Sequence, residues 1–257
     1  MIAKKPLIVY LHGFLGNPNE LDFLGHKQGL YDVYGVPWVT LLRNNKHATL
    51  GDVAMAINTY LDEAEIKGGS LYGYSMGGRL AMQLVSLYPH KWKSLILESA
   101  HVGFENGIQR REEQVKWEEH FKQLTHNNTN DFLKKWYKQP LFKKSKALIT
   151  NDAWKQKETY DIELIRQWGI QLQTANQGYF IPFLKEWKKP ILYLAGKEDK
   201  KYSKLAKTIE KQVETAKSII IEDSDHNVHV CNANNVKKTL DDFINNMEIS
   251  NGIITKF

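Results

Sequence analysis

The chain has 257 residues, of which 42% are hydrophobic and 25% are charged, and it shows no low-complexity tract or internal repeat. This length suits one large domain or a core domain with an insertion, and the composition excludes collagen-like and disordered chains. The net charge is +6, but the basic residues are interspersed with acidic ones and no nucleic-acid-binding motif is present. We therefore expect a small anionic substrate rather than nucleic acid as the partner.

The N-terminal apolar run at residues 6–11 is too short for a membrane span or the core of a secretory signal, and it predicts a buried strand. Cys231 is the single cysteine, so no intrachain disulfide can form. These features predict a cytoplasmic protein without a membrane span, as a monomer or small homo-oligomer.

Short, nearly continuous apolar runs predict strands that are covered on both faces, as in a parallel sheet. They lie at residues 7–11, 36–42, 70–74, 94–99, 191–196 and 218–222. Helical patterns lie between most of them, at residues 50–66 (with Thr49 as N-cap), 76–89, 202–214 and 234–247. This alternation predicts the α/β class, with a mostly parallel sheet flanked by helices.

The alternation stops between residues 100 and 188, where only helical patterns such as 110–124 and 131–140 are found. Five of the seven tryptophans fall in this segment, and we expect most of them to pack it onto the rest of the protein. The sequence thus predicts a core made of residues 1–101 and 188–257, with residues 102–187 inserted as a helical lid.

A G-x-S-x-G motif, "GYSMG" at residues 73–77, joins the end of a predicted strand to the start of a helix. Such a sharp turn places the Ser75 hydroxyl above the sheet, at a helix N-terminus that favours negative charge. The segment "LHGFLG" after the first strand resembles the loop of α/β-hydrolases that supplies an oxyanion-hole donor. The backbone N–H groups of Phe14 and Met76 are the predicted donors, and His12 is expected to be structural.

An acid and a histidine should follow the serine in chain order. Asp199, with Glu198 as a weaker alternative, follows the fifth predicted strand, and His226 follows the sixth. Both places are at the sheet edge where open α/β sheets hold their sites, so we predict a triad of Ser75, Asp199 and His226. His229 has no third ligand at zinc spacing, so we expect it to pack and expect no metal.

The motifs "GYSMGGR", "DFLKKWYKQPLF", "YLAGKEDKKYSKLA" and "DHNVH" together resemble the 2-succinyl-6-hydroxy-2,4-cyclohexadiene-1-carboxylate synthase family of the α/β-hydrolase superfamily. The Trp-Tyr-x-Gln-Pro piece in the predicted lid is the most specific of them. The resemblance implies an α/β-hydrolase fold and a cofactor-independent carbon–oxygen lyase of menaquinone or phylloquinone biosynthesis. Such enzymes eliminate pyruvate from a polyanionic cyclohexene carboxylate.

The resemblance also implies that Ser75 is the base that removes a proton α to a carbonyl, with His226 and Asp199 raising its basicity. Substrate-binding positions of the family correspond to Tyr74, Arg79, Arg110, Trp136 and Gln173. Gln173 stands where the family would have a third carboxylate-binding arginine.

The residues themselves support two of these assignments. Arg79 lies one helical turn after Ser75, and Arg110 begins the first lid helix, where its guanidinium could bind a carboxylate in a bidentate manner.

Two departures from the family pattern bear on substrate specificity more than on mechanism. Asp225 replaces the glycine that precedes the catalytic histidine, and the segment 35–49 replaces an Asp-x-Pro-Gly-His-Gly motif. The alternative is a carboxylesterase or thioesterase for small acidic esters, with Ser75 as the nucleophile. A non-enzymatic binding module is a third possibility, which a complete triad disfavours.

Overall fold

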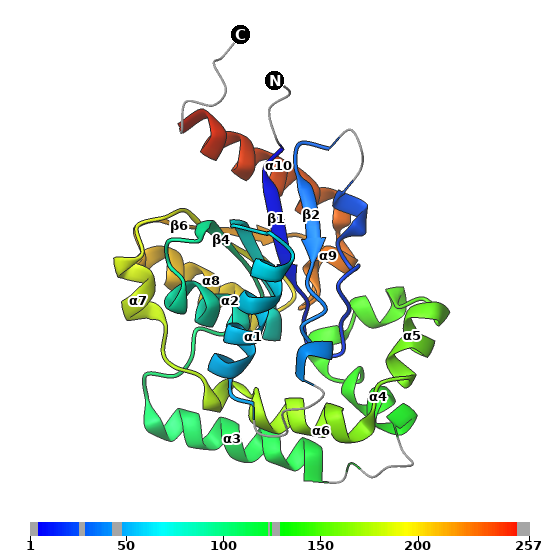
Figure 1. Ribbon diagram of the computed structural model, residues 1–257. Helices are drawn as coiled ribbons and strands as arrows, with labels where there is room; N and C mark the ends of the chain where they lie inside the picture. Colours follow the sequence, from blue (N-terminus) through cyan, green and yellow to red (C-terminus); the bar gives the residue numbers. More distant parts are fainter. Residues whose placement is uncertain (1–4, 26–28, 43–47, 123, 125–128, 251–257) are drawn as a thin grey trace.

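The structure is a computed structural model, and it describes residues 5–25, 29–42, 48–122, 124 and 129–250. Six strands form one sheet in the order β2-β1-β3-β4-β5-β6, and every neighbouring pair is parallel (Figure 1). The strands are β1 (Leu7–Leu11), β2 (Asp32–Gly35), β3 (Gly69–Tyr74), β4 (Trp92–Glu98), β5 (Ile191–Gly196) and β6 (Ala216–Ile221). The predicted α/β class with a parallel sheet is confirmed.

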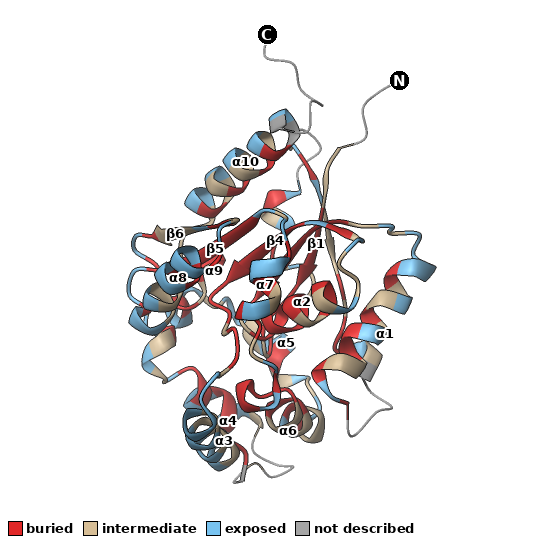
Figure 2. Cartoon of the chain, turned by 90° about the vertical axis from the view of Figure 1, so that its left-hand side faces the viewer, coloured by how far each residue is buried: buried red, intermediate tan, exposed pale blue. Residues whose placement is uncertain are grey.

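Helices cover both faces of this sheet. One apolar cluster joins the strands to α1 (Leu50–Glu63), α2 (Met76–Leu87), α7 (Ile181–Glu186) and α8 (Lys200–Gln212). A second cluster, on the other face, includes α9 (Val228–Cys231), α10 (Ala233–Ser250) and the short helix η1 (Asp22–Leu24). In Figure 2 the strands accordingly appear as a buried layer between partly exposed helices. Double coverage explains why the strand sequences are apolar at nearly every position.

The segment 102–187, called the helical insertion below, lies between β4 and β5, which pair directly with each other. Its helices are α3 (Gly107–Lys122), α4 (Thr129–Trp136), α5 (Asn151–Glu158), α6 (Ile162–Gln171) and α7, with the short turns η3 (Pro140–Phe142), η4 (Ser145–Leu148) and η5 (Thr174–Asn176). The described part of the insertion contains no strand. Helices α3 to α6 lie beyond the carboxyl ends of the strands, where a third apolar cluster forms (Figure 1).

The prediction of a strand at residues 36–42 is wrong. The strand ends at Gly35, and the following residues form a turn and the short helix η2 (Thr40–Leu42). Pro37 has no N–H to donate to a strand ladder, and its carbonyl instead accepts a hydrogen bond from the Thr40 N–H at 2.9 Å. Trp38 is nevertheless fully buried and stacks on His12. The apolar run therefore belongs to a loop that buries Val36, Trp38 and Val39.

The predicted N-cap of α1 is confirmed. The Thr49 side chain accepts a hydrogen bond from the Asp52 N–H, and the Asp52 carboxylate accepts one from the Thr49 N–H, which is a complete capping box. Among the described residues, no helix is long and apolar enough to span a membrane.

Candidate active site

The turn between β3 and α2 holds Ser75 in a strained conformation, with φ 50° and ψ −110°. The chain can turn so sharply because residues 73 and 77, two positions before and after Ser75, are glycines. A Cβ on Gly73 would lie 2.4 Å from the Gly77 carbonyl oxygen, and a Cβ on Gly77 would lie 2.0 Å from the Leu11 carbonyl oxygen. The Ser75 N–H donates to the Glu98 carbonyl at 2.8 Å, which ties the turn to β4. The G-x-S-x-G spacing is therefore a steric requirement of this turn.

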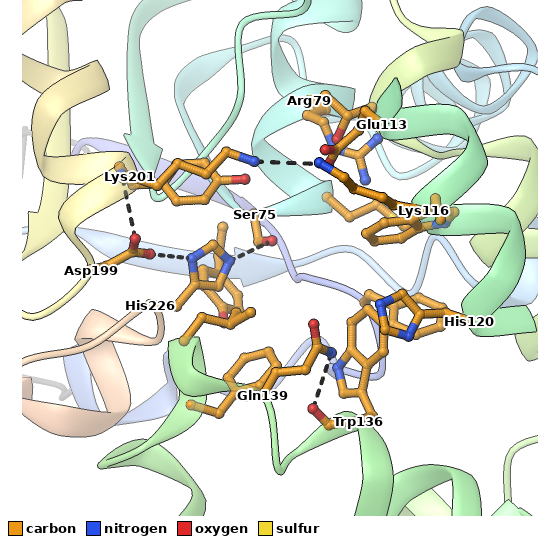
Figure 3. Close-up of a pocket in the computed structure, with 18 residues that line it drawn as sticks. Ser75, Arg79, Glu113, Lys116, His120, Trp136, Gln139, Asp199, Lys201 and His226 are labelled. Atoms are coloured by element: carbon orange, nitrogen blue, oxygen red, sulfur yellow. Dashed lines mark hydrogen bonds and ion pairs between the residues drawn. The ribbon is translucent and has the colours of Figure 1, made fainter. Parts of the chain in front are cut away.

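The three side chains predicted as a triad lie in one hydrogen-bonded chain (Figure 3). His226 Nε2 is 3.0 Å from Ser75 Oγ, and His226 Nδ1 is 2.7 Å from Asp199 Oδ2. Asp199 is held in place as the N-cap of α8, because its other oxygen accepts a hydrogen bond from the Tyr202 N–H. Glu198, the weaker alternative, contacts Lys144 Nζ at 2.6 Å instead.

The two predicted oxyanion-hole residues, Phe14 and Met76, line the same cavity as Ser75. Met76 is the first residue of α2, so its N–H has no acceptor within the helix. Within the described part of the chain, neither N–H donates to a carbonyl of another element. The insertion braces the loop that carries Phe14, because Lys157 Nζ donates to the Leu15 carbonyl at 2.6 Å.

A cavity of about 280 Å³ lies beside Ser75, between the core and the helical insertion. Tyr74, Arg79 and Trp136, three of the five predicted substrate-binding residues, line it. Sequence reasoning missed the other polar or aromatic residues of its wall, which are Glu113, Lys116, Trp117, His120, Gln139, Phe142, Thr174, Lys201 and Tyr202.

Three cationic side chains, those of Arg79, Lys116 and Lys201, line the cavity together with two carboxylates, those of Glu113 and Asp199. Arg79 is buried and donates to the Leu172 carbonyl, and its burial lowers the guanidinium pKa to about 10, which still leaves it charged at neutral pH. Lys201 Nζ lies 3.8 Å from Glu113 Oε1. Tyr202, Glu113 and Asp199 raise the pKa of the Lys201 ammonium, against the opposing effect of burial. Burial, and then the charges of Lys201 and Arg79, lower the pKa of His101 to about 3.

Arg110 and Gln173, the other two predicted substrate-binding residues, do not line the cavity. The Arg110 guanidinium donates to three backbone carbonyls, those of Phe104, Ala175 and Gln177, at 2.7–2.9 Å. It therefore holds the start of α3 against the η5 turn. The Gln173 side chain is buried and donates to the Ile170 carbonyl at 3.0 Å. An arginine at this position would enter packed protein.

The missed residues on α3 share one helix face, since Glu113, Lys116 and His120 are spaced by three and four residues. The sequence shows this spacing, but charged residues lie on all sides of α3. No apolar stripe therefore marks which face turns inward.

Glu98, His229 and Tyr72 form a buried hydrogen-bonded cluster next to the Ser75 turn. The Glu98 carboxylate accepts hydrogen bonds from the backbone N–H and Nδ1 of His229 at 3.1 and 2.9 Å, and from the Tyr72 hydroxyl. Burial alone would raise the pKa of Glu98, but the charge and hydrogen bonds of His229 outweigh it and lower the pKa. Burial would lower the pKa of His229, but Glu98 reverses this and raises it. His229 thus packs against Glu98 and joins α9 to β4, and it forms a buried ion pair with Glu98 when its ring is protonated.

The comparisons with known proteins agree with this architecture. Residues 6–233 match the family described as alpha/beta hydrolase fold. Curated relatives named 2-succinyl-6-hydroxy-2,4-cyclohexadiene-1-carboxylate synthase include one from Klebsiella pneumoniae subsp. pneumoniae, 28% identical over 243 residues, and one from Salmonella typhimurium, 26% identical over 233 residues. Each alignment covers 87% of this chain and 88% of the relative. These names confirm the resemblance seen in the sequence.

Two similar solved structures carry different names. The structure of MenH from S. aureus has a TM-score of 0.82 and 23% identity, and covers 96% of both chains. A thermophilic esterase from Thermogutta terrifontis, with malate bound, has a TM-score of 0.74 and 13% identity, and covers 95% of this chain and 91% of the esterase. At these identities the structures show the shared fold. The match of residues 6–233 and the six-stranded parallel sheet establish that the chain belongs to the α/β-hydrolase fold family.

Proposed function

We propose that the protein is a cofactor-independent carbon–oxygen lyase that eliminates pyruvate from a polyanionic cyclohexene carboxylate in menaquinone or phylloquinone biosynthesis. The observation that carries the proposal is the set of cations Arg79, Lys116 and Lys201 in the same cavity as Ser75. A substrate with several carboxylates would pair with these cations. An apolar ester would instead strip water from them without offering a partner, which costs free energy.

In this proposal Ser75, His226 and Asp199 act as one proton-transfer unit. As Ser75 Oγ takes the proton α to the substrate carbonyl, its own proton passes to His226 Nε2, and Asp199 stabilises the imidazolium that forms. The electron pair of the broken C–H bond forms an enolate, whose oxygen the Phe14 and Met76 N–H groups would hold. The pair then expels the pyruvate group with cleavage of its C–O bond. The departing enolate takes up the proton held by His226, which restores the neutral imidazole, and becomes pyruvate.

The same proposal assigns residues 102–187 as a lid and residues 1–101 and 188–257 as the core. Walls of the cavity come from both parts: Ser75 and Lys201 belong to the core, whereas Lys116 and Trp136 belong to the insertion. Exclusion of water by such a lid would strengthen the contacts between the cations and the substrate.

The runner-up is a carboxylesterase or thioesterase for small acidic esters. A distance of 3.0 Å between Ser75 Oγ and His226 Nε2 suits a nucleophilic serine as well as a basic one. In that reaction Ser75 would form an acyl-enzyme that water resolves.

One experiment separates the two activities. The purified protein is incubated with the pyruvate-bearing pathway intermediate, and released pyruvate is followed by coupled reduction to lactate. In parallel, p-nitrophenyl acetate and a p-nitrophenyl half-ester of succinate are tested for a burst of p-nitrophenol. Pyruvate release without a burst supports the lyase. A burst and steady ester turnover without pyruvate release would replace it with the esterase.

Lys201→Met is expected to raise KM for the polyanionic substrate about tenfold, near the lower end of about 1.5–3 kcal/mol for a hydrogen bond to a charged group. The lower end applies because the Lys201 side chain is 53% exposed and therefore screened by water. Lys200→Met is the matched control, since Lys200 is exposed, follows Asp199 on the same helix and does not line the cavity. Steady-state kinetics of both variants give the comparison, and equal KM values would remove Lys201 from the binding site.

A further inference from the structure

Asp225 occupies an unusual place for a carboxylate. It directly precedes His226 and is only 1% exposed. No cationic side chain of the described residues forms an ion pair with it, and the nearby Lys144 Nζ contacts Glu198 and Asp223 instead. A buried, unpaired carboxylate is costly unless hydrogen bonds satisfy it. The hydrogen-bond donors to the Asp225 carboxylate identify the segments that this residue connects.

Both oxygens of Asp225 are fully engaged. Oδ2 accepts hydrogen bonds from the backbone N–H groups of Lys144 and Ser145, each at 2.8 Å, and from the Ser145 hydroxyl at 3.0 Å. Oδ1 accepts from the Asn227 N–H at 3.0 Å and from Cys231 Sγ at 3.3 Å. Oδ2 therefore binds the helical insertion, and Oδ1 binds the loop and helix that follow His226.

A reciprocal bond completes the connection, because the His226 N–H donates to the Leu141 carbonyl at 3.1 Å. Residues 141–145 and 225–226 are thus joined by four hydrogen bonds across about 80 positions of sequence. The joined segment also shapes the cavity. Leu141 and Phe142 line it, and the Phe142 and His226 rings form a T-shaped contact with a centroid distance of 5.8 Å.

We propose that Asp225 is a positioning residue, which fastens residues 141–145 of the helical insertion to the histidine loop and so fixes His226 and the wall formed by Leu141 and Phe142. A neutral residue cannot replace it fully. Asparagine presents an amide NH₂ to one set of N–H donors, and glycine presents nothing to either set. The proposal does not depend on whether the enzyme is a lyase or an esterase, because both activities use the His226 geometry.

The first test uses limited digestion with trypsin. The bonds after Lys143 and Lys144 are candidate cleavage sites, and their N–H groups are the two that Asp225 holds. We expect Asp225→Gly to be cut between residues 143 and 145 at least ~10-fold faster than the wild type, and the rate for Asp225→Asn to lie between these two. Mass spectrometry of the early fragments identifies the cut, and the rate needs no substrate.

The second test measures kcat and KM on whichever substrate the wild type turns over. Misplacement of a catalytic group by about 1 Å can cost about 10²-fold, so we expect kcat of Asp225→Gly to fall by about 10- to 100-fold. KM should change less, since the cavity cations are elsewhere. If Asp225 were only structural, the variant would contain less folded protein, which active-site titration and thermal unfolding would detect. The kcat per folded molecule would then be unchanged.

Asp223→Asn is the matched control. Asp223 lies two residues earlier in the same loop, its side chain is 87% exposed, and its interaction partner is the Lys144 ammonium. It should leave both cleavage and kcat unchanged. Wild-type cleavage in folded Asp225→Gly or Asp225→Asn would overturn the fastening, and faster cleavage with unchanged kcat would overturn the positioning of His226. If Asp225→Gly does not fold, the near-isosteric Asp225→Asn carries both tests.

Discussion

Replacing Ser75 with alanine is expected to lower kcat by at least ~10³-fold, and His226→Ala should cost about as much. The reason is geometric: Ser75 Oγ, His226 and Asp199 are linked by hydrogen bonds of 3.0 and 2.7 Å, so one proton-transfer unit is lost in either variant. The double variant should be little worse than each single one, because effects within a unit are not additive. Steady-state assays of pyruvate release and ester hydrolysis measure all three.

Ser86→Ala controls for the loss of a serine hydroxyl, at a position on α2, the helix that Ser75 precedes. The Ser86 hydroxyl donates to the Gln83 carbonyl and does not line the cavity, so activity should remain at the wild-type level. Ser75→Ala should fold normally, since the glycines around it, rather than its hydroxyl, allow the turn. Near-normal turnover in folded Ser75→Ala would refute the proposed mechanism for both the lyase and the esterase.

The largest effect on stability is expected from Glu98→Gln. Glutamine would turn an NH₂ group toward donors that the carboxylate now accepts from, which are the His229 ring, the His229 N–H and the Tyr72 hydroxyl. Breaking a buried ion pair typically costs about 3–5 kcal/mol, and we expect about 3 here because histidine can release its proton, unlike lysine or arginine. Urea unfolding at pH 6 gives the free energy.

The pH dependence of this loss follows from the two pKa shifts. Glu98 has a lowered pKa in the folded state, so its contribution is present above its ordinary value of 4.5 and is lost as the pH falls through the lowered value. His229 has a raised pKa, so its contribution is fully present below 6.5 and is lost as the pH rises through the raised value. The difference in unfolding free energy between the wild type and Glu98→Gln should therefore be largest between about pH 4.5 and 6.5.

Glu222→Gln provides the control for this measurement. Glu222 forms an ion pair with Lys197, but its side chain is 64% exposed, so its loss should change the unfolding free energy by no measurable amount. An equally small effect of Glu98→Gln across the whole pH range would show that the buried pair contributes nothing beyond packing.

The sequence by itself determined the α/β class and the chain positions of the Ser75, Asp199 and His226 motifs. These follow from local rules. Strands covered on both faces must be apolar throughout, and the turn at Ser75 needs glycines because Gly73 and Gly77 meet backbone atoms of the chain. The same rules failed at residues 36–42, where a loop has the apolar composition of a strand. Pro37, which lacks an N–H for a strand ladder, was the available warning.

The tertiary structure alone decided which polar residues of the helical insertion face the site. Arg110 and Gln173 were expected there, but backbone carbonyls from distant segments hold the first and packing encloses the second. Lys116 of the insertion lines the cavity instead, together with Lys201 of α8. Asp225 contacts residues about 80 positions away. The physical reason is that a charged helix can turn any side inward, so local patterns do not fix its orientation. Contacts between segments far apart in the chain do fix it.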